Sequence, residues 1–164
     1  MHLRGFLASV FVDGFTDADW DHGLGGLHVI VVDDDGAIRG HASIAQRHLM
    51  IGGQHSPHRV GYVEGVAVDP AARGQGVASS IMATINDIIT RSYDFGALCA
   101  TEQGLPVYQR SGWQVWRGAL WALTPNGIVA TEGDRGAVMV YENGSLPLDI
   151  DADLTADWRV GDAW

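Results

Sequence analysis

Apolar and polar positions alternate along the first third of the chain in blocks that predict one helix and two strands. The opening stretch LRGFLASVF has the apolar spacing of a helix that ends near Asp13 and Gly14. Residues 27–32 and 37–51 are β-branched or alternating runs, and the DDDG stretch between them is a strong hairpin signal. Asp and Gly tolerate the left-handed backbone of a tight turn, so we expect two antiparallel strands here.

The rest of the chain alternates strand patterns with helix patterns. We expect a strand over about 59–68, stopped by Asp69-Pro70, and then a helix from Gly76 to about Ile89. The further expected elements are a short buried strand in GALCAT, a short helix in GLPVYQRSGW, strands near 114–117 and 137–141, and a turn-rich loop over 124–136. The acidic tail after 148 has no clear period. This order predicts an α/β or α+β fold, a mixed sheet covered by helices.

Length and composition indicate one globular domain spanning residues 1–164, because 46% of the residues are hydrophobic. Uninterrupted apolar runs stay well below the roughly 18 residues of a membrane helix, and the first residues do not follow the pattern of a secretion signal. We therefore expect a soluble, cytoplasmic protein. The single cysteine, Cys99, cannot form an internal disulfide, and the seven His lack the paired spacing of a zinc site, so no metal is expected.

The formal charge is −10, from 20 acidic residues against 10 Arg and no Lys. Such a field repels nucleic acid and acidic membranes and attracts cations. A cationic small ligand therefore fits the composition. A second interpretation stays open, in which the acidity serves only solubility.

The stretch YVEGVAVDPAARGQGVASSIM, residues 62–82, joins a strand to a helix through a turn that contains Gly74 and Gly76. Backbone N–H groups at such a helix start hold phosphate oxygens, which makes the turn a candidate phosphate site, although an ordinary strand-to-helix turn remains the alternative. The turn lacks the Gly-Lys-Ser/Thr of a Walker loop and the GxGxxG of a dinucleotide site. Glu64 lies inside the strand, where Gly65 permits a bulge. It is a candidate acid or base, or else a solvent-facing carboxylate.

The segment VAVDPAARGQGVAS resembles the acetyl-CoA motif of the GCN5-related N-acetyltransferases (GNAT superfamily), and YQRSGW resembles their late helix that ends in an aromatic-Gly turn. The resemblance implies that backbone amides at the turn hold the pyrophosphate of acetyl-CoA, while the preceding strand pairs with the pantetheine arm. The cofactor-binding residues that it implies are Val66, Ala67, Val68, Arg73, Gly74, Gln75, Gly76, Val77, Ala78 and Ser79.

Four segments together are similar to the aminoglycoside 2'-N-acetyltransferases: FTDADWDHGLGGLHV, GYVEGVAV, GALCATEQGLPVYQRSGW and the terminal DWRVGDAW. The likeness covers nearly the whole chain from about Phe11 onward. It implies a GNAT fold, which is a mixed, mostly antiparallel sheet with helices on both faces, here without the usual first strand. It further implies acetylation of the 2'-amino group of aminoglycosides, a role in antibiotic resistance, and a homodimer.

The resemblance also implies roles for individual residues. Glu64 would be the base, acting through water, and Tyr108 the acid facing the sulfur of CoA. A backbone N–H within 66–68 would stabilise the oxyanion. The substrate-binding residues that it implies are Asp13, Asp19, Gly65, Cys99, Asp134, Asp162 and Trp164.

Two positions depart from the family pattern. Gly14 stands where an Asp commonly precedes the Phe, with Asp13 one residue earlier, and Cys99 stands where relatives carry a Ser. Two other functions stay open beside drug acetylation. One is a housekeeping enzyme that acetylates an amino-sugar metabolite, and the other is a protein that binds aminoglycosides or acyl-CoA without turnover.

Overall fold

The computed structural model describes residues 2–11, 14–53 and 56–164. Its elements in chain order are α1 (Leu3–Val10), α2 (Asp17–Gly23), β1 (Leu27–Val32), β2 (Ile38–Ile51), β3 (His58–Val68), the 3₁₀ turn η1 (Pro70–Ala72), α3 (Val77–Ser92), β4 (Phe95–Cys99), α4 (Leu105–Arg110), β5 (Gln114–Val115), β6 (Leu120–Thr124), β7 (Gly127–Ala130), η2 (Glu132–Asp134), β8 (Val138–Tyr141) and β9 (Leu154–Ala156). No helix in these ranges is both long enough and apolar enough to cross a membrane.

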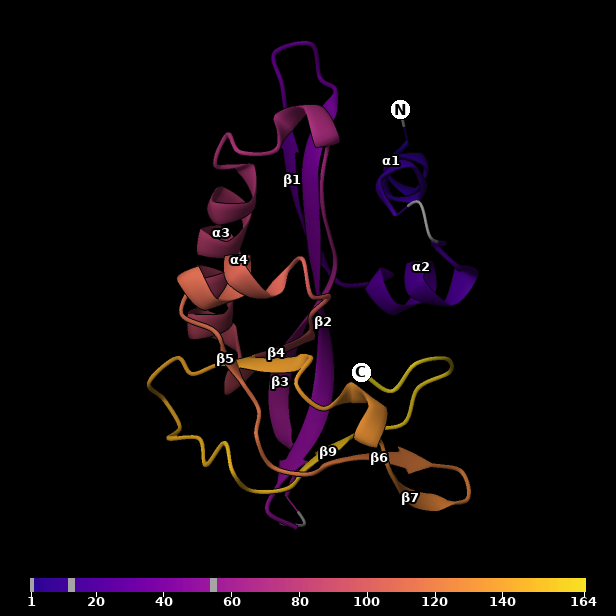
Figure 1. Cartoon of the computed structure of the whole chain (residues 1–164), viewed down its shortest axis with the longest axis vertical. Helices are drawn as coiled ribbons and strands as arrows, with labels where there is room; N and C mark the ends of the chain where they lie inside the picture. Colours follow the sequence, from indigo (N-terminus) through magenta and orange to yellow (C-terminus); the bar gives the residue numbers. More distant parts are fainter. Residues whose placement is uncertain (1, 12–13, 54–55) are drawn as a thin grey trace.

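The described strands form one sheet in the order β5-β8-β4-β3-β2-β9-β6-β7, with β1 also paired to β2. The β3–β4 and β6–β9 pairs are parallel, and the other described pairs are antiparallel. Helices α3 and α4 cover one face, and α1 and α2 lie on the other (Figure 1). The predicted mixed, mostly antiparallel sheet with helices on both faces is confirmed.

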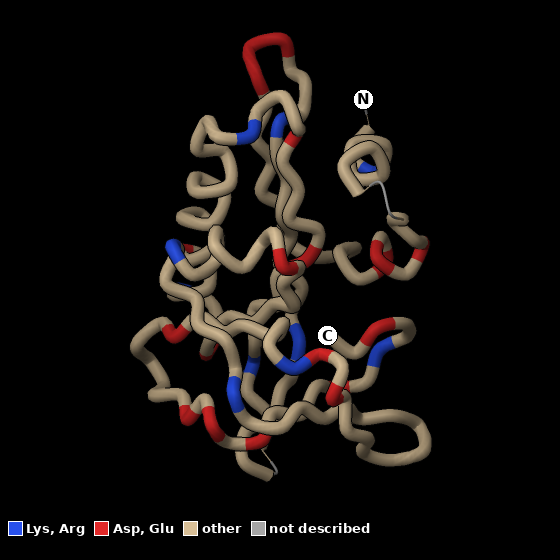
Figure 2. Tube along the Cα trace, viewed as in Figure 1, with Lys and Arg blue, Asp and Glu red and all other residues tan. Residues whose placement is uncertain are grey.

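The early hairpin forms as its sequence predicts. Asp33 Oδ1 accepts hydrogen bonds from the amides of Asp35 at 3.1 Å and Ala37 at 2.8 Å, and Gly36 has a φ of 77°. The acidic tip of this hairpin lies at one end of the molecule (Figure 2). Part of the net negative charge is therefore far from the middle of the sheet.

The parallel strands β3 and β4 separate part of the way along their length. They pair only from Val60 with Phe95 to Tyr62 with Ala97. Beyond Tyr62, β3 continues to Val68 against β2, and β4 continues to Cys99 against β8. The edge of β3 that faces β4 is thereby left with backbone groups to which a ligand in extended conformation can bind.

A β-bulge at Gly65 shapes β3 just beyond this separation. Between the pairs His41–Ala67 and Ser43–Glu64, one residue of β2 lies opposite two of β3, and Gly65 has a φ of 58° that glycine adopts without strain. The buried His41 ring bonds through Nδ1 to the Gly65 carbonyl at 2.8 Å and through Nε2 to His28 Nδ1 at 2.9 Å. A carbonyl only accepts, so His41 Nδ1 donates, and Nε2 of the neutral ring accepts from His28.

Several parts of the fold differ from the sequence prediction. Strand β6 was not predicted, and the loop expected over 124–136 contains β7 and η2, because Pro125-Asn126 forms a two-residue hairpin turn between β6 and β7. The Thr124 hydroxyl closes this turn by accepting from the Asn126 amide and donating to the Gly127 carbonyl. Both faces of β7 are exposed, so it carries no alternating pattern. Helix α2 begins with a capping box at Thr16, and β9 is a three-residue strand buried between β2 and β6. Neither was predicted.

The C-terminal segment is held to the sheet by Arg47 of β2, whose side chain is 5% exposed. Its guanidinium donates to the Asp157 carboxylate at 2.8 Å, to the Asp157 carbonyl at 3.0 Å and to the Ala163 carbonyl at 2.7 Å. It also lies 4.6 Å from the centre of the Tyr62 ring. Each of the three guanidinium nitrogens thus donates to the tail, which offsets the cost of burying the charge.

The hydrogen bond from His41 to the Gly65 carbonyl leads to a prediction about the stability of the protein. Replacing His41 with Leu leaves the Gly65 carbonyl without its donor and should lower the free energy of unfolding by about 1–3 kcal/mol, whereas Gln can still donate to it. Burial lowers the pKa of His41 below the ordinary 6.5, so the unfolded chain takes up the proton first as pH falls. Wild-type stability should therefore decrease as pH drops through about 6.5, and His41→Gln should remove part of that decrease.

Urea denaturation at about pH 7.5 and pH 5.5 measures both effects. If wild type and His41→Gln lost the same stability between the two pH values, a buried neutral His41 would be excluded as the source.

Candidate active site

Glu64 lies on β3 between the point where β3 leaves β4 and the bulge at Gly65. Its side chain is 18% exposed, and Arg159 Nη1 donates to its Oε1. A small cavity beside it is lined by Asp19 and Trp20 of α2 and by Gly65. The structure therefore brings three residues of the predicted site, Asp19, Glu64 and Gly65, to one place.

Asp19 is also part of the capping box that starts α2. Its Oδ2 accepts bonds from the Thr16 amide and hydroxyl, each at 2.8 Å, and its own amide donates to the Thr16 hydroxyl at 3.1 Å. The carboxylate thus orients the helix that forms one wall of the cavity. The neighbouring candidate Asp13 lies outside the described residues.

Cys99, Asp134 and Asp162 gather near Glu64 from β4, η2 and the tail. Cys99 is exposed at the end of β4, and partial desolvation raises the pKa of its thiol to about 11, with further increases from the charges of Asp134, Glu64 and Asp162. Burial also raises the pKa of Asp134, and the charge of Asp162 adds to that effect. Carboxylates from three separate elements therefore face one region, which makes it a favourable place for a cation.

Arg159 is a central residue of this site that the sequence prediction missed. Its side chain is 14% exposed, Nε donates to the Asp162 carbonyl at 2.6 Å, and the guanidinium lies 5.2 Å from the centre of the Tyr62 ring. The signal available in the sequence was an arginine inside an otherwise acidic tail. Only the folded chain shows that this arginine forms an ion pair with Glu64, the candidate base.

Tyr62 lies beneath this cluster, fully buried, where β3 and β4 part. Its hydroxyl has no hydrogen-bond partner among the described residues. Burial, with a further contribution from the charge of Glu64, raises its pKa well above the usual value. Tyr62 therefore stays a neutral phenol, and it was not predicted as a site residue.

Trp164 is placed as an anchor of the tail. Its ring is 6% exposed within the core, and Nε1 donates to the Thr131 hydroxyl at 2.8 Å. Thr131 precedes η2, which carries Asp134. The ring therefore fixes the segment that bears an acceptor carboxylate, and the structure gives it a core position rather than an open wall.

Tyr108 of α4 approaches the site from the side of the sheet that α3 covers. It is 8% exposed, and burial, followed by the charge of Cys99, raises its pKa to about 12. Its hydroxyl makes no hydrogen bond within the described ranges. Trp113, 6.4 Å from it between ring centres, ties the end of α4 to α3 through a 2.9 Å bond to Asn86. The phenol is thus held rigidly, protonated and available to a ligand.

The turn before α3 has the features of an anion site. Gly74 and Gly76 have φ values of 76° and 83°, and Gly76 caps the helix. Ser80 is the first residue of the helix whose amide bonds back along it, to the Gly76 carbonyl at 3.0 Å, so the amides of 77–79 point out of the helix end. The Gln75 side chain bonds internally to the Ala71 carbonyl, and Arg73 is exposed.

The anion turn and the carboxylate cluster are joined by one stretch of β3. From the turn, the open edge leads back along Val68, Ala67 and Val66 to the bulge and Glu64. A phosphate-bearing ligand bound at the turn can therefore extend along this edge and present its far end among Glu64, Cys99 and Tyr108. Such a geometry suits transfer of a group from an extended donor to a cationic acceptor.

Comparison with known proteins agrees with this geometry. Residues 4–116 match the family model described as "Acetyltransferase (GNAT) domain". A curated relative, the "Aminoglycoside 2'-N-acetyltransferase" of Mycolicibacterium fortuitum, is 37% identical over 164 residues, covering 98% of this chain and 83% of that protein.

Solved structures agree at the level of the fold. A GNAT family N-acetyltransferase (YhbS) from Escherichia coli, solved in complex with CoA, aligns with a TM-score of 0.63 and 18% identity over 94% of this chain and 81% of its own. Eis1 from Mycobacterium abscessus aligns with a TM-score of 0.58 and 21% identity over 71% of this chain but only 29% of its own. The chain is therefore an acyltransferase that belongs to the GNAT superfamily and, within it, to the aminoglycoside 2'-N-acetyltransferase family.

Proposed function

We propose that this protein transfers the acetyl group of acetyl-CoA to the 2'-amino group of aminoglycosides. One observation carries the proposal: Glu64, Asp134 and Asp162 converge, with Cys99, at the end of the open edge of β3. A site of that charge selects a polycation, and the name of the Mycolicibacterium fortuitum relative states such a substrate. We further propose that this activity confers antibiotic resistance. The protein would act in the cytoplasm, where acetyl-CoA is available, and would assemble as a homodimer.

Acetyl-CoA would bind along β3 and the turn after it. The amides of 77–79 fit its pyrophosphate, because they lie in the first turn of a 16-residue helix whose dipole favours negative charge there, with the glycine turn of 73–76 leading into it. The backbone of Val66–Val68 fits the pantetheine arm, which would pair with it as an added strand. A backbone amide of the same stretch would stabilise the oxyanion that forms on the thioester carbonyl.

The acceptor would lie between α2 and the tail, with its ammonium groups on Asp19, Asp134 and Asp162. Charge-assisted hydrogen bonds of this kind orient the sugar and hold one amino group near the thioester. Glu64 would take the proton of that amine through a water molecule. The freed amine attacks the carbonyl carbon and the C–S bond breaks, while the second proton lost by the nitrogen passes through water to the thiolate, so that CoA leaves as the thiol.

Tyr108 would stabilise the departing thiolate. Its pKa of about 12 keeps the phenol protonated at every physiological pH. A thiol, with a pKa of roughly 8.5, is the stronger acid, so complete transfer of the phenolic proton to sulfur is uphill. This difference in acidity favours a hydrogen bond from Tyr108 to the sulfur over full protonation of the sulfur.

Substrate choice tests the proposal directly. Kanamycin B carries an amino group at C2' and kanamycin A a hydroxyl, and the two drugs are otherwise the same. Purified protein with acetyl-CoA should add one acetyl group to kanamycin B, detected by mass spectrometry, and leave kanamycin A unmodified because it lacks the nucleophile. Modification of both drugs would place the reaction at another amine, and turnover of amino sugars alone would favour a metabolic role.

Replacing Glu64 with Gln should lower kcat/KM for kanamycin B by about 100-fold at neutral pH, where the amine must lose a proton. The deficit should shrink as pH rises toward 9–10, roughly the range in which the free amine becomes abundant without help. Rates measured across this range with saturating acetyl-CoA provide the test. A loss of equal size at every pH would remove Glu64 as the base.

Replacing Tyr108 with Phe should lower kcat by about 10- to 100-fold and leave KM for acetyl-CoA nearly unchanged, because only the developing thiolate loses a donor. The wild-type rate should show no loss from ionisation of Tyr108 up to about pH 10, since its pKa is about 12. Tyr141→Phe is a matched control, because Tyr141 also lies against Trp113, at 5.6 Å between ring centres. Equal rates for Tyr108→Phe and wild type would exclude the proposed role.

A further inference from the structure

Arg159 forms an ion pair with Glu64, the carboxylate that the proposed reaction uses as its base. Its guanidinium binds Glu64 Oε1, and both side chains are largely buried, at 14% and 18% exposure. The guanidinium thereby takes the hydrogen-bonding position on Oε1 that an incoming ammonium group would need. With this ion pair intact, Glu64 is badly placed to serve an incoming amine.

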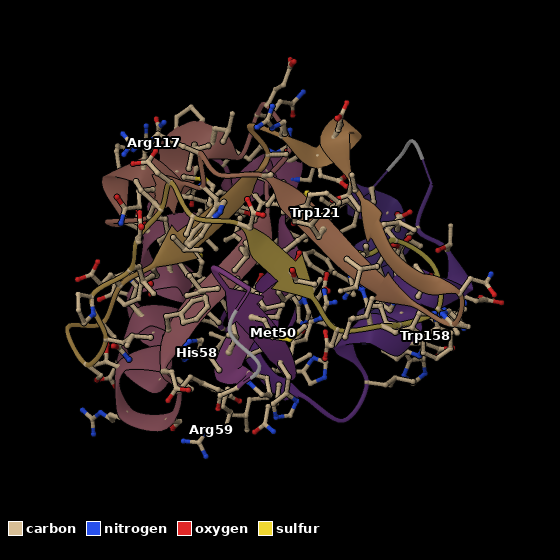
Figure 3. All side chains as sticks on the ribbon, turned by 90° about the horizontal axis from the view of Figure 1, so that it is seen from below. Met50, His58, Arg59, Arg117, Trp121 and Trp158 are labelled. Carbon is tan, nitrogen blue, oxygen red and sulfur yellow. The ribbon has the colours of Figure 1, made fainter. Side chains whose placement is uncertain are left out.

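The segment 157–164, which carries Arg159, is fixed at its two ends, and the large apolar side chains between the ends are exposed. Asp157 is fixed by Arg47, and Trp164 is fixed by Thr131 and the core. Between them, Trp158 is 53% exposed and Val160 is 70% exposed. Figure 3 shows Trp158 at the edge of the molecule. Movement of Arg159 therefore requires no apolar side chain to leave the core.

The polar contacts of this segment are few. His22 Nε2 donates to the Val160 carbonyl at 2.7 Å, and Gly161 has a φ of 85°. The Arg159 side chain itself bonds only to Glu64 and to the Asp162 carbonyl among the described residues. The ion pair with Glu64 is thus the main contact that would have to break.

We infer that Arg159 sets an affinity threshold for the acceptor: it is an internal cation that holds Glu64 in the resting enzyme, and the acceptor's amino group must displace it. The inference rests on the proposed function. A guanidinium and an ammonium group carry the same positive charge, so they compete for the carboxylate of Glu64. The nearby carboxylates of Asp134 and Asp162 favour either cation there.

This competition costs every amine the same ion pair, and a polycation has more charges with which to offset that cost. An amine with one positive charge exchanges one ion pair for another at Glu64 and gains little. An aminoglycoside makes the same exchange but also reaches Asp19, Asp134 and Asp162. A molecule therefore needs more positive charges to displace Arg159 and bind Glu64 than it would need if Glu64 were free.

Binding measurements test the competition. Isothermal titration with CoA present would compare kanamycin B and glucosamine on wild type and on Arg159→Gln. The variant should bind both ligands about tenfold more tightly, the scale of one charge-assisted hydrogen bond that no longer has to be broken. Arg135→Gln is the matched control, because it removes one positive charge from an exposed residue next to Asp134 and should change affinity by less than about twofold.

NMR of the arginine side chains tests the displacement itself. Hindered rotation should keep the Nη signals of Arg159 distinct in the ligand-free wild type, and saturating kanamycin B should average them; the Arg159→Gln spectrum assigns them. Kanamycin A, which lacks the 2'-amine, should leave them distinct.

Each outcome decides between the two proposals. Tighter binding by Arg159→Gln together with averaged Nη signals supports the inference. Weaker or equal binding by Arg159→Gln, or signals that stay distinct with bound kanamycin B, overturns it and leaves the proposed function intact. If wild type neither binds nor acetylates kanamycin B, the proposed function fails and the inference fails with it.

Discussion

The separation of β3 from β4 after Tyr62 is the constraint on which the rest of the site depends. A parallel pair that stayed hydrogen-bonded to its end would leave no backbone edge for a ligand and no gap between Glu64 and Cys99. Each strand is instead held by its other neighbour, β3 by β2 and β4 by β8. The two walls of the site are therefore supported independently, and the opening between them does not require strained backbone in either strand.

The bulge at Gly65 and two arginines, Arg47 and Arg159, fix what lies at this opening. His41 holds the bulge carbonyl, which sets the direction of β3 after Glu64. Arg47 and Arg159 both lie against the Tyr62 ring, at 4.6 Å and 5.2 Å, and both bind the C-terminal tail. The tail is therefore held at the site by two guanidinium groups that lie over the Tyr62 ring. A cation over an aromatic ring is stabilised when its charge is removed from water.

The parts of this protein that the sequence predicted are the parts encoded by neighbouring residues. The DDDG turn, the strand ended by Asp69-Pro70 and the glycine turn before α3 each depend on local backbone preference, and each is present. Glu64 and its bulge were predicted for the same reason, because Gly65 follows directly in the chain.

What the sequence missed depends on contacts between distant residues. The Arg159–Glu64 pair joins positions 95 apart, and β9 is a strand only because β2 and β6 lie on either side of it. The capping role of Asp19 is local and could have been read from Thr16 three residues earlier. The buried position of the Trp164 ring could not, since the ring is placed by Thr131 and a core assembled from six strands.

The surroundings of Cys99 bear on the course of acetyl transfer. A covalent route through an acetyl-cysteine would need a thiolate, and a pKa of about 11 leaves roughly one thiolate per ten thousand molecules at pH 7. The carboxylates that raise this pKa are the same groups proposed to attract the acceptor, so a site built for a polycation is also one that suppresses a nucleophilic thiol. The amine of the acceptor is then the better nucleophile, which favours direct transfer from acetyl-CoA in a single step.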